Sequence, residues 1–182
     1  MHREEEERWI PWMPENLVPD EYELYEILQS WEGVRLRFIG RRVNVTIEYG
    51  SEFVSLRSCD ESERWRSVAR ELAVQGKAGF GGRLAFTAVN SRYVEWLCEE
   101  SAGVQEKERL VHCVFVACND LVDVLSYALP KVTVEPRDTD RTDLWSLAET
   151  LSAKTPDAGT AAAELPAAKA EPPAAEPLAA KT

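Results

Sequence analysis

Cysteine and histidine are the residue types in this chain that best suit nucleophilic or metal chemistry. Cys98 and His112 lie in separate apolar segments, and a thiol beside an imidazole can act as a nucleophile. Cys113 follows His112 directly in an expected strand, so these two side chains point to opposite faces and cannot form such a pair. No Cys-x-x-Cys motif is present, and the other histidine, His2, lies near the N-terminus. We therefore expect no metal site, no cofactor and no cysteine catalysis, and we keep a small enzyme using Cys98 and His112 as an alternative.

A second candidate for acid–base chemistry is the polar stretch that contains Asp60 and Glu63. Two neighbouring carboxylates can transfer protons or bind a metal ion. Their three-residue spacing is also typical of a helix N-terminus, where Asp60 caps the first turn and acidic side chains suit the helix dipole. We prefer capping as the interpretation and keep a catalytic pair as the alternative.

Residues 76–82, Gly-Lys-Ala-Gly-Phe-Gly-Gly, resemble a phosphate-binding loop only in their glycine content. A P-loop leads from a strand into a helix and ends in Gly-Lys-Ser/Thr. This segment is expected between a helix and a strand, and Ala78 follows Lys77. We therefore interpret it as a plain connection, and we keep as an alternative a mobile loop whose tip residue, Phe80, contacts another protein.

The uneven distribution of charge is the most informative functional signal. The net charge of the chain is −11, yet residues 33–97 hold eleven Lys and Arg against seven acidic residues. Arg35, Arg37 and Arg57 fall in expected strands, opposite the apolar side chains, and we expect them to share one face of one sheet. Arg41 and Arg42 lie in an adjoining turn. Such a row of guanidinium groups can bind carboxylates or phosphates in a bidentate fashion.

This arginine face has three candidate occupants. The first is internal, through ion pairs with Glu48, Glu52 or the acidic N-terminal segment, and the second is the acidic surface of another protein. The third is nucleic acid, whose single strands require exposed aromatic side chains among the basic ones. Only Phe53 qualifies on this face, and a sequence pI of about 4.8 also disfavours nucleic acid.

The patterning predicts an α+β fold: an antiparallel-rich sheet of five or six strands with three or four helices. Residues 34–38 and 43–49 alternate apolar and polar side chains, which is typical of half-buried antiparallel strands. Residues 110–118 are almost continuously apolar, so we expect a central strand that is covered on both faces. Further strands are expected at 53–57, 83–89 and 131–135. Helices are expected at 20–33, from 60 to 75, from a cap at Asn90 to 103, and at 121–129.

Composition divides the chain into four parts. They are an extended acidic arm with two tryptophans among prolines (1–19), a single α+β domain (20–136), a linker with a weak amphipathic helix (137–153) and a disordered Ala/Pro-rich tail (154–182). Trp9 and Trp12 in the arm either pack on their own domain, which we prefer, or contact a partner. The four cysteines suit a reduced compartment, and no window has the length and apolarity of a membrane span.

These observations favour a non-enzymatic, cytoplasmic protein-interaction module, such as a regulator, an inhibitor or an immunity-type protein. Its partner is expected to be another protein, bound through the arginine face, the arm or the tethered C-terminal helix. The candidate contact residues are Trp9, Trp12, Arg35, Arg37, Arg41, Arg42, Arg57 and Phe80. The alternatives are a small enzyme that uses Cys98 and His112 or Asp60 and Glu63, and a nucleic-acid-associated accessory protein. The patterning predicts no oligomeric state.

Overall fold

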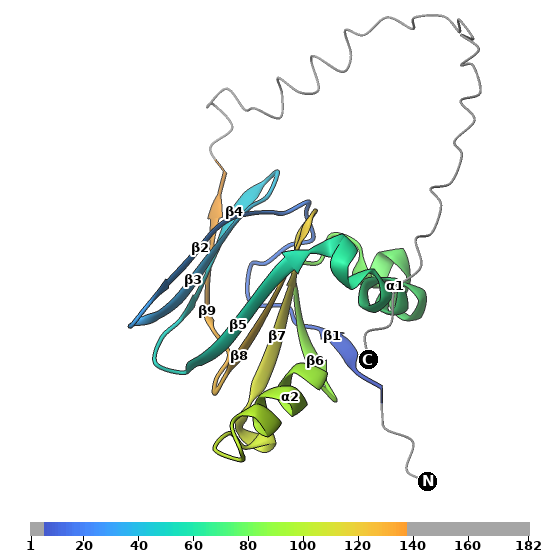
Figure 1. Ribbon diagram of the computed structural model, residues 1–182. Helices are drawn as coiled ribbons and strands as arrows, with labels where there is room; N and C mark the ends of the chain where they lie inside the picture. The colour runs from blue at the N-terminus through green and yellow to red at the C-terminus, as the bar shows by residue number, and fades with distance from the viewer. Residues whose placement is uncertain (1–5, 138–182) are drawn as a thin grey trace, which may run out of the picture. The chain divides into compact units, whose positions relative to one another are not determined.

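Two antiparallel β-sheets and a few helices form the part of the chain that the computed structural model describes, residues 6–137 (Figure 1). Sheet A contains, in spatial order, β1 (Arg8–Pro11), β6 (Ala85–Val89), β7 (Val111–Val116), β8 (Asp120–Ser126) and β5 (Phe53–Asp60). Sheet B contains β2 (Glu23–Ser30), β3 (Gly33–Ile39), β4 (Val43–Tyr49) and β9 (Lys131–Pro136). The helices are η1 (Glu61–Arg64), α1 (Trp65–Phe80), α2 (Arg92–Glu100) and η2 (Lys107–Arg109). The predicted α+β class is therefore confirmed.

The main core lies between the two sheets. In β3 and β4 the period-two pattern turns one set of side chains inward, and Leu36, Phe38 and Ile47 are at most 1% exposed. β7 and β8 supply the opposing layer, which includes Phe115 and Val124. β3 and β4 therefore each have one apolar face and one more polar face, as their sequence predicts.

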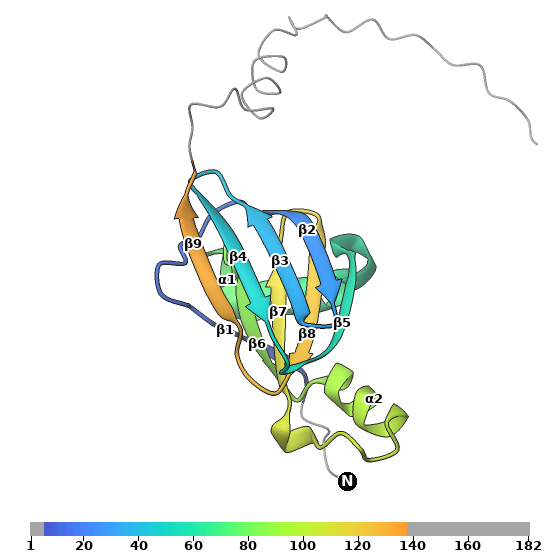
Figure 2. The same ribbon diagram turned by 90° about the vertical axis from the view of Figure 1, so that its left-hand side faces the viewer.

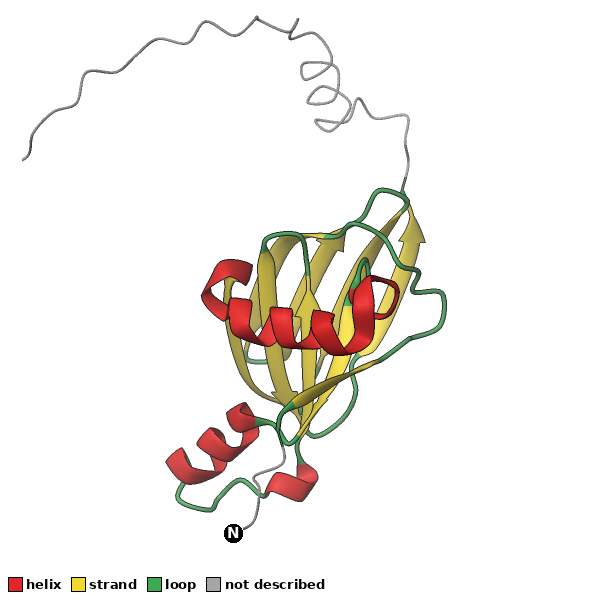
Figure 3. Cartoon of the chain, turned by 90° about the vertical axis from the view of Figure 1, so that its right-hand side faces the viewer, coloured by secondary structure: helices red, strands yellow, loops and turns green. Residues whose placement is uncertain are grey.

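Helices cover the outer face of sheet A (Figure 3). α1 lies across this face and packs Val68 against a cluster that includes Phe86 and Val114. α2 packs Tyr93 against Leu125. β7 is therefore buried on both faces, by sheet B on one side and by helices on the other, as its continuous apolar run predicts.

The outer face of sheet B is open. Figure 2 shows β9, β4, β3 and β2 side by side, and no helix of residues 6–137 lies over them. The exposed residues of β3 alternate strictly with the buried ones. The hydrophobic pattern of these strands thus leaves one complete sheet face available to solvent or to a partner.

The prediction of one sheet of five or six strands is wrong, because the described residues contain nine strands in two sheets. The expected helix at 20–33 is β2 instead. A β-bulge between Leu24 and Glu26 shifts the register by one residue. Leu24 and Ile27 consequently both pack against the core although they are three residues apart. The helix was expected because Leu24, Tyr25, Leu28 and Trp31 recur at a helical spacing, but the last three of these side chains are exposed.

The expected helix at 121–129 is also a strand, β8. Every residue from Leu121 to Ser126 is buried, so the segment has no polar side that would distinguish a strand from a helix. The connection expected at 76–82 is mostly helical, because α1 continues to Phe80 across a kink at Gly76, where φ is 70°. The cap of α2 is Ser91, next to the predicted Asn90.

Candidate functional site

The open face of sheet B carries Arg35 and Arg37, both in β3. Val34, Leu36 and Phe38 point into the core, so the alternation of the strand sends the two arginines outward. Each arginine side chain is 47% exposed. The predicted arginine face therefore exists on β3, at the centre of an open sheet.

Cross-strand ion pairs occupy this face. Arg35 Nε lies 3.4 Å from Glu48 Oε1, and Lys131 Nζ lies 3.6 Å from Glu48 Oε2. Arg37 NH1 lies 4.0 Å from Glu26 Oε2. Exposed pairs of this kind contribute about 0–1 kcal/mol each to stability. They are weak enough for a partner's carboxylates to compete for the two arginines.

Apolar side chains border the arginines along β2 and its turn into β3. Trp31 is 93% exposed, Tyr25 is 62% exposed and Leu28 is 49% exposed. The guanidinium carbon of Arg37 lies 5.2 Å from the centre of the Tyr25 ring, which is a cation–π distance. We call Tyr25, Leu28, Trp31, Arg35 and Arg37 together the β2–β3 surface.

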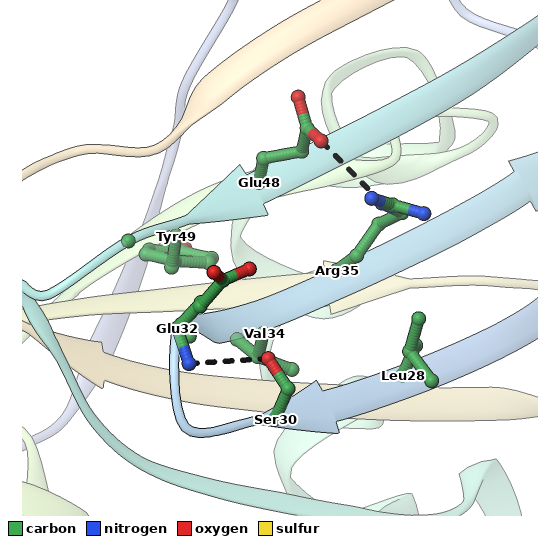
Figure 4. A pocket seen from close by; sticks show the side chains of 9 residues that line it. Leu28, Ser30, Glu32, Val34, Arg35, Glu48 and Tyr49 are labelled. Atoms are coloured by element: carbon green, nitrogen blue, oxygen red, sulfur yellow. Dashed lines mark hydrogen bonds and ion pairs between the residues drawn. The ribbon is translucent and has the colours of Figure 1, made fainter.

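Two depressions adjoin the β2–β3 surface. The first has a volume of about 250 Å³ and lies where β2, β3 and β4 meet, between Leu28, Glu32, Arg35 and Glu48 (Figure 4). The second has a volume of about 230 Å³ and lies at the opposite end of β3. Its lining includes Tyr25 and Arg37. Exposed aromatic groups, paired charges and surface hollows thus occur together on one sheet face.

Arg57 lies in the other sheet, so the expectation that it shares a face with Arg35 and Arg37 is corrected, whereas Arg41 and Arg42 lie in the adjoining turn as expected. Arg57 projects from β5, in sheet A, and its Nε donates to Asp123 Oδ2 at 2.9 Å. Arg41 and Arg42, in the turn between β3 and β4, pair with acidic residues just before β2. The partners are Glu21 at 2.6 Å and Asp20 at 3.8 Å. The physical reason is that β5 pairs with β8 rather than with β4.

The aromatic candidates of the arm and of the glycine-rich segment are not surface contacts. Trp9 is 0% exposed and Phe80 is 7% exposed. Their rings stack with centroids 6.2 Å apart, beneath α1 and against Phe86. Trp12 is partly buried and packs against the main core. Residues 8–11 pair with β6 as β1, so the arm packs on its own domain.

A buried polar network lies on the helix-covered face of sheet A. His112 Nδ1 is 2.7 Å from Ser91 Oγ, and His112 Nε2 is 2.8 Å from Asp123 Oδ1. Arg57 and Arg64 both donate to the other carboxylate oxygen of Asp123. Ser91, His112 and Asp123 are at most 3% exposed. Both ring nitrogens of His112 are thus engaged, and neither is bonded to Cys98.

A chain of serine, histidine and aspartate is the arrangement that activates a serine nucleophile. Here, however, Ser91 Oγ already accepts the N–H of Val94 as the cap of α2, and only 3% of Ser91 is exposed. A substrate could reach Ser91 only if α2 moved away from the sheet. The geometry therefore fits a structural network that joins α2 to sheet A.

The sequence analysis missed Ser91 and Asp123 as members of this network. Asp123 was placed in an expected helix, where a single acid can face solvent. In a strand, Asp123 shares a face with Leu121 and Leu125, which lie two residues away on either side. This face is covered, and a buried ionised group needs partners. A single acid, Asp123, among the apolar residues 121–125 was the signal in the sequence that could have revealed the network.

The partners of Asp123 determine its protonation. Burial alone raises the pKa of this carboxyl, but the hydrogen bond and charge of His112 and the guanidinium groups of Arg57 and Arg64 outweigh burial. The pKa of Asp123 is consequently held well below its usual range. Asp123 is therefore ionised whenever the protein is folded at ordinary pH.

The stabilisation supplied by Asp123 is expected to disappear in acid. Its pKa is lower in the folded chain than in the unfolded chain, where it is about 3.9. Above that pH the stabilisation is complete, and below it the unfolded state takes up the proton first, so stability is lost as the pH falls. The difference in unfolding free energy between the natural chain and Asp123→Ala should narrow as the pH falls from 5 to 3. Urea unfolding at each pH measures it, and a difference that widens in acid would contradict this assignment.

Asp60 and Cys98, two of the remaining catalytic candidates, make local contacts in the described residues, and the structure shows no contact between them. Asp60 caps η1, with its Oδ1 accepting the Ser62 N–H at 2.8 Å, and hydrogen bonds from the side chain and then the backbone of Ser62 lower the pKa of Asp60. Burial raises the pKa of Cys113 to about 11, which keeps this thiol protonated. Cys98 packs in the cluster under α2. Residues 6–137 contain no group of three or more His, Cys, Asp or Glu residues placed to hold a metal ion.

No family model, no curated protein and no solved structure matches this chain. Among the residues that the structure describes, no helix has the length and apolarity needed to cross a bilayer.

Proposed function

We propose that this protein is a non-enzymatic interaction module that binds another protein through the β2–β3 surface. The observation that carries the proposal is the exposure of Trp31, 93%, at the rim of an open sheet face. Tryptophan, tyrosine and arginine are the residue types that most often dominate the energy of protein interfaces. The β2–β3 surface brings all three together with adjoining hollows.

The exposure of Trp31 exceeds that of the other tryptophans on the described surface. Trp65 in α1 is 58% exposed and Trp96 in α2 is 50% exposed. The ring of Trp96 also stacks on Tyr93, with centroids 5.8 Å apart. Trp65 and Trp96 lie within helices, whereas Trp31 lies in the two-residue turn between β2 and β3. Burial of an aromatic side chain against a partner would remove this apolar area from water.

The arginines favour a partner with acidic groups within reach of β3. Arg35 and Arg37 each pair with one carboxylate inside the sheet, yet their side chains remain about half exposed. A partner carboxylate can accept the remaining N–H groups, and charge-assisted bonds of this kind strengthen when water is excluded. Nucleic acid is disfavoured because Glu26 and Glu48 lie on the same face and the chain has a net charge of −11.

An enzymatic role is the second candidate, and its specific support is the Ser91–His112–Asp123 geometry. We favour binding because Ser91 is buried and serves as a helix cap. Binding of a partner thus accounts for the exposure of Tyr25 and Trp31. Fold stability accounts for the buried Ser91–His112–Asp123 network.

Replacing Trp31 by alanine is expected to weaken capture of the partner at least tenfold, because the largest exposed apolar contact is removed. The unfolding temperature should change little, because Trp31 packs on almost nothing in the free protein. The measurement is quantitative mass spectrometry of proteins retained from the native host by the tagged full chain. The partner is the protein retained by the natural chain in proportion to its amount.

Trp65→Ala is the matched control, since it removes an exposed tryptophan from the helix-covered side of the molecule. This variant should retain the partner at the natural level. Equal retention by Trp31→Ala and the natural chain would refute the β2–β3 surface as the binding site.

A further inference from the structure

β2 is an edge strand of sheet B, with β3 as its only neighbour. Proteins usually protect such edges with proline, lysine, bulges or covering segments, because unpaired backbone groups recruit other strands. The bulge between Leu24 and Glu26 interrupts the first half of β2. The second half, from Glu26 to Ser30, keeps a regular register with β3 and contains no proline or lysine. By contrast, β9 at the opposite edge carries both Lys131 and Pro136.

The hairpin geometry determines which backbone groups of β2 are unpaired. Ser30 pairs with Gly33 across a two-residue turn, and this closing pair of such a hairpin exchanges backbone hydrogen bonds. The antiparallel ladder alternates, so Leu28 and Glu26 are also bonded to β3, whereas Ile27 and Gln29 are not. The N–H and C=O groups of Ile27 and Gln29 therefore point away from the sheet. Gln29 is exposed, so this edge is accessible.

The side chains around this edge are acidic. Glu21, Glu23, Glu26 and Glu32 lie in or beside β2. Glu21 and Glu26 have arginine partners, but Glu23 and Glu32 make no ion pair within residues 6–137. A strand added here would place alternate side chains beside Glu26 on the outer face and beside Ile27 toward the core. Basic and apolar residues in alternation complement these two positions.

We infer that β2 accepts an extended, alternately basic and apolar segment of a partner protein by antiparallel or parallel strand addition. This inference rests on the proposed function and names how the partner engages the β2 edge, while the acidic groups that meet Arg35 and Arg37 on β3 lie in another part of the same partner. Trp31 then covers the end of the added strand, and the backbone of Ile27 and Gln29 supplies the hydrogen bonds. A second copy of this chain is a poor occupant, because it would bring the same glutamates together between two chains of net charge −11.

The test uses a fluorescent nine-residue peptide of alternating valine and lysine as the probe, with the full chain and fluorescence anisotropy as the readout. Gln29→Pro removes one outward N–H and blocks pairing at the edge, and it breaks no bond to β3. We expect it to weaken peptide binding at least tenfold. Gln29→Ala keeps the backbone and should bind within twofold of the natural chain. A peptide with glutamate in place of lysine should not bind at the same concentrations.

Hydrogen exchange gives a second readout that needs no variant. The amides of Ile27 and Gln29 in the natural chain should become protected when the valine–lysine peptide is added. Unprotected amides would overturn the inference, and so would equal peptide binding by Gln29→Pro and Gln29→Ala. A dimer of the natural chain that Gln29→Pro converts to monomer would also overturn it, with a second copy as the occupant.

The capture assay separates the inference from the proposed function. If Gln29→Pro still retains the host partner and Trp31→Ala does not, strand addition is wrong and the binding surface stands. If both variants retain the partner at the natural level, the binding surface itself is wrong.

Discussion

Replacing Asp123 by alanine is expected to lower the free energy of unfolding by about 3–5 kcal/mol at pH 7. The carboxylate is fully buried and receives hydrogen bonds from His112, Arg57 and Arg64. Its removal leaves Arg64, whose side chain is only 16% exposed, without this carboxylate partner. The cost arises mainly because Arg64 and His112 stay buried after losing this partner. Among the described residues, Arg64 then keeps only the ion pair with Glu7 at 3.6 Å, and His112 keeps only the hydrogen bond with Ser91.

Urea unfolding followed by tryptophan fluorescence measures this loss. Glu48→Ala is the matched control, because it removes a carboxylate that also has two cationic partners but lies on the open face. The control should cost less than about 1 kcal/mol, as exposed pairs do. A loss of similar size in both variants would show that the buried network does not join the helices to sheet A.

Replacing Trp9 by alanine is expected to cost about 3–5 kcal/mol, the usual loss for a large aromatic residue in a core. Trp9 is 0% exposed, stacks on Phe80 and donates its Nε1–H to Glu7 at 3.1 Å. The guanidinium carbon of Arg64 also lies 5.3 Å from the Trp9 ring. The substitution therefore opens a cavity under α1 and loosens β1 from β6.

Urea unfolding of Trp9→Ala and Trp65→Ala gives the comparison, with far-UV circular dichroism as the probe so that tryptophan removal does not affect the signal. Trp65 is more than half exposed, so its replacement should stay within about 0.5 kcal/mol of the natural chain. A small effect at both positions would mean that the N-terminal strand contributes little to the folded domain.

The open face of sheet B was largely predictable from sequence. Residues 34–38 and 43–49 alternate without interruption, and alternation alone places Arg35 and Arg37 outward and their neighbours inward. The number of sheets was not predictable in this way. Alternation specifies which side of a strand is buried but not which strand lies beside it, so Arg57 was assigned to the wrong sheet.

The β2–β3 surface was predicted only in part. Tyr25, Leu28 and Trp31 recur with Leu24 at a helical spacing, so they were expected on one face of a helix although they are exposed. In β8 the burial of every residue from Leu121 to Ser126 hid the strand and, with it, the role of Asp123. Both errors arise because the spacing of apolar residues does not by itself show whether a segment is a helix or a strand.

The most direct test of the interaction surface is photo-cross-linking of the full chain with p-benzoylphenylalanine at position 31, and separately at position 65 as the control. Irradiation in the native host should link position 31 to one predominant protein, and position 65 should link to it at least tenfold less. Equal cross-linking from both positions, or a link from position 65 alone, would contradict the assignment of the β2–β3 surface as the site of binding.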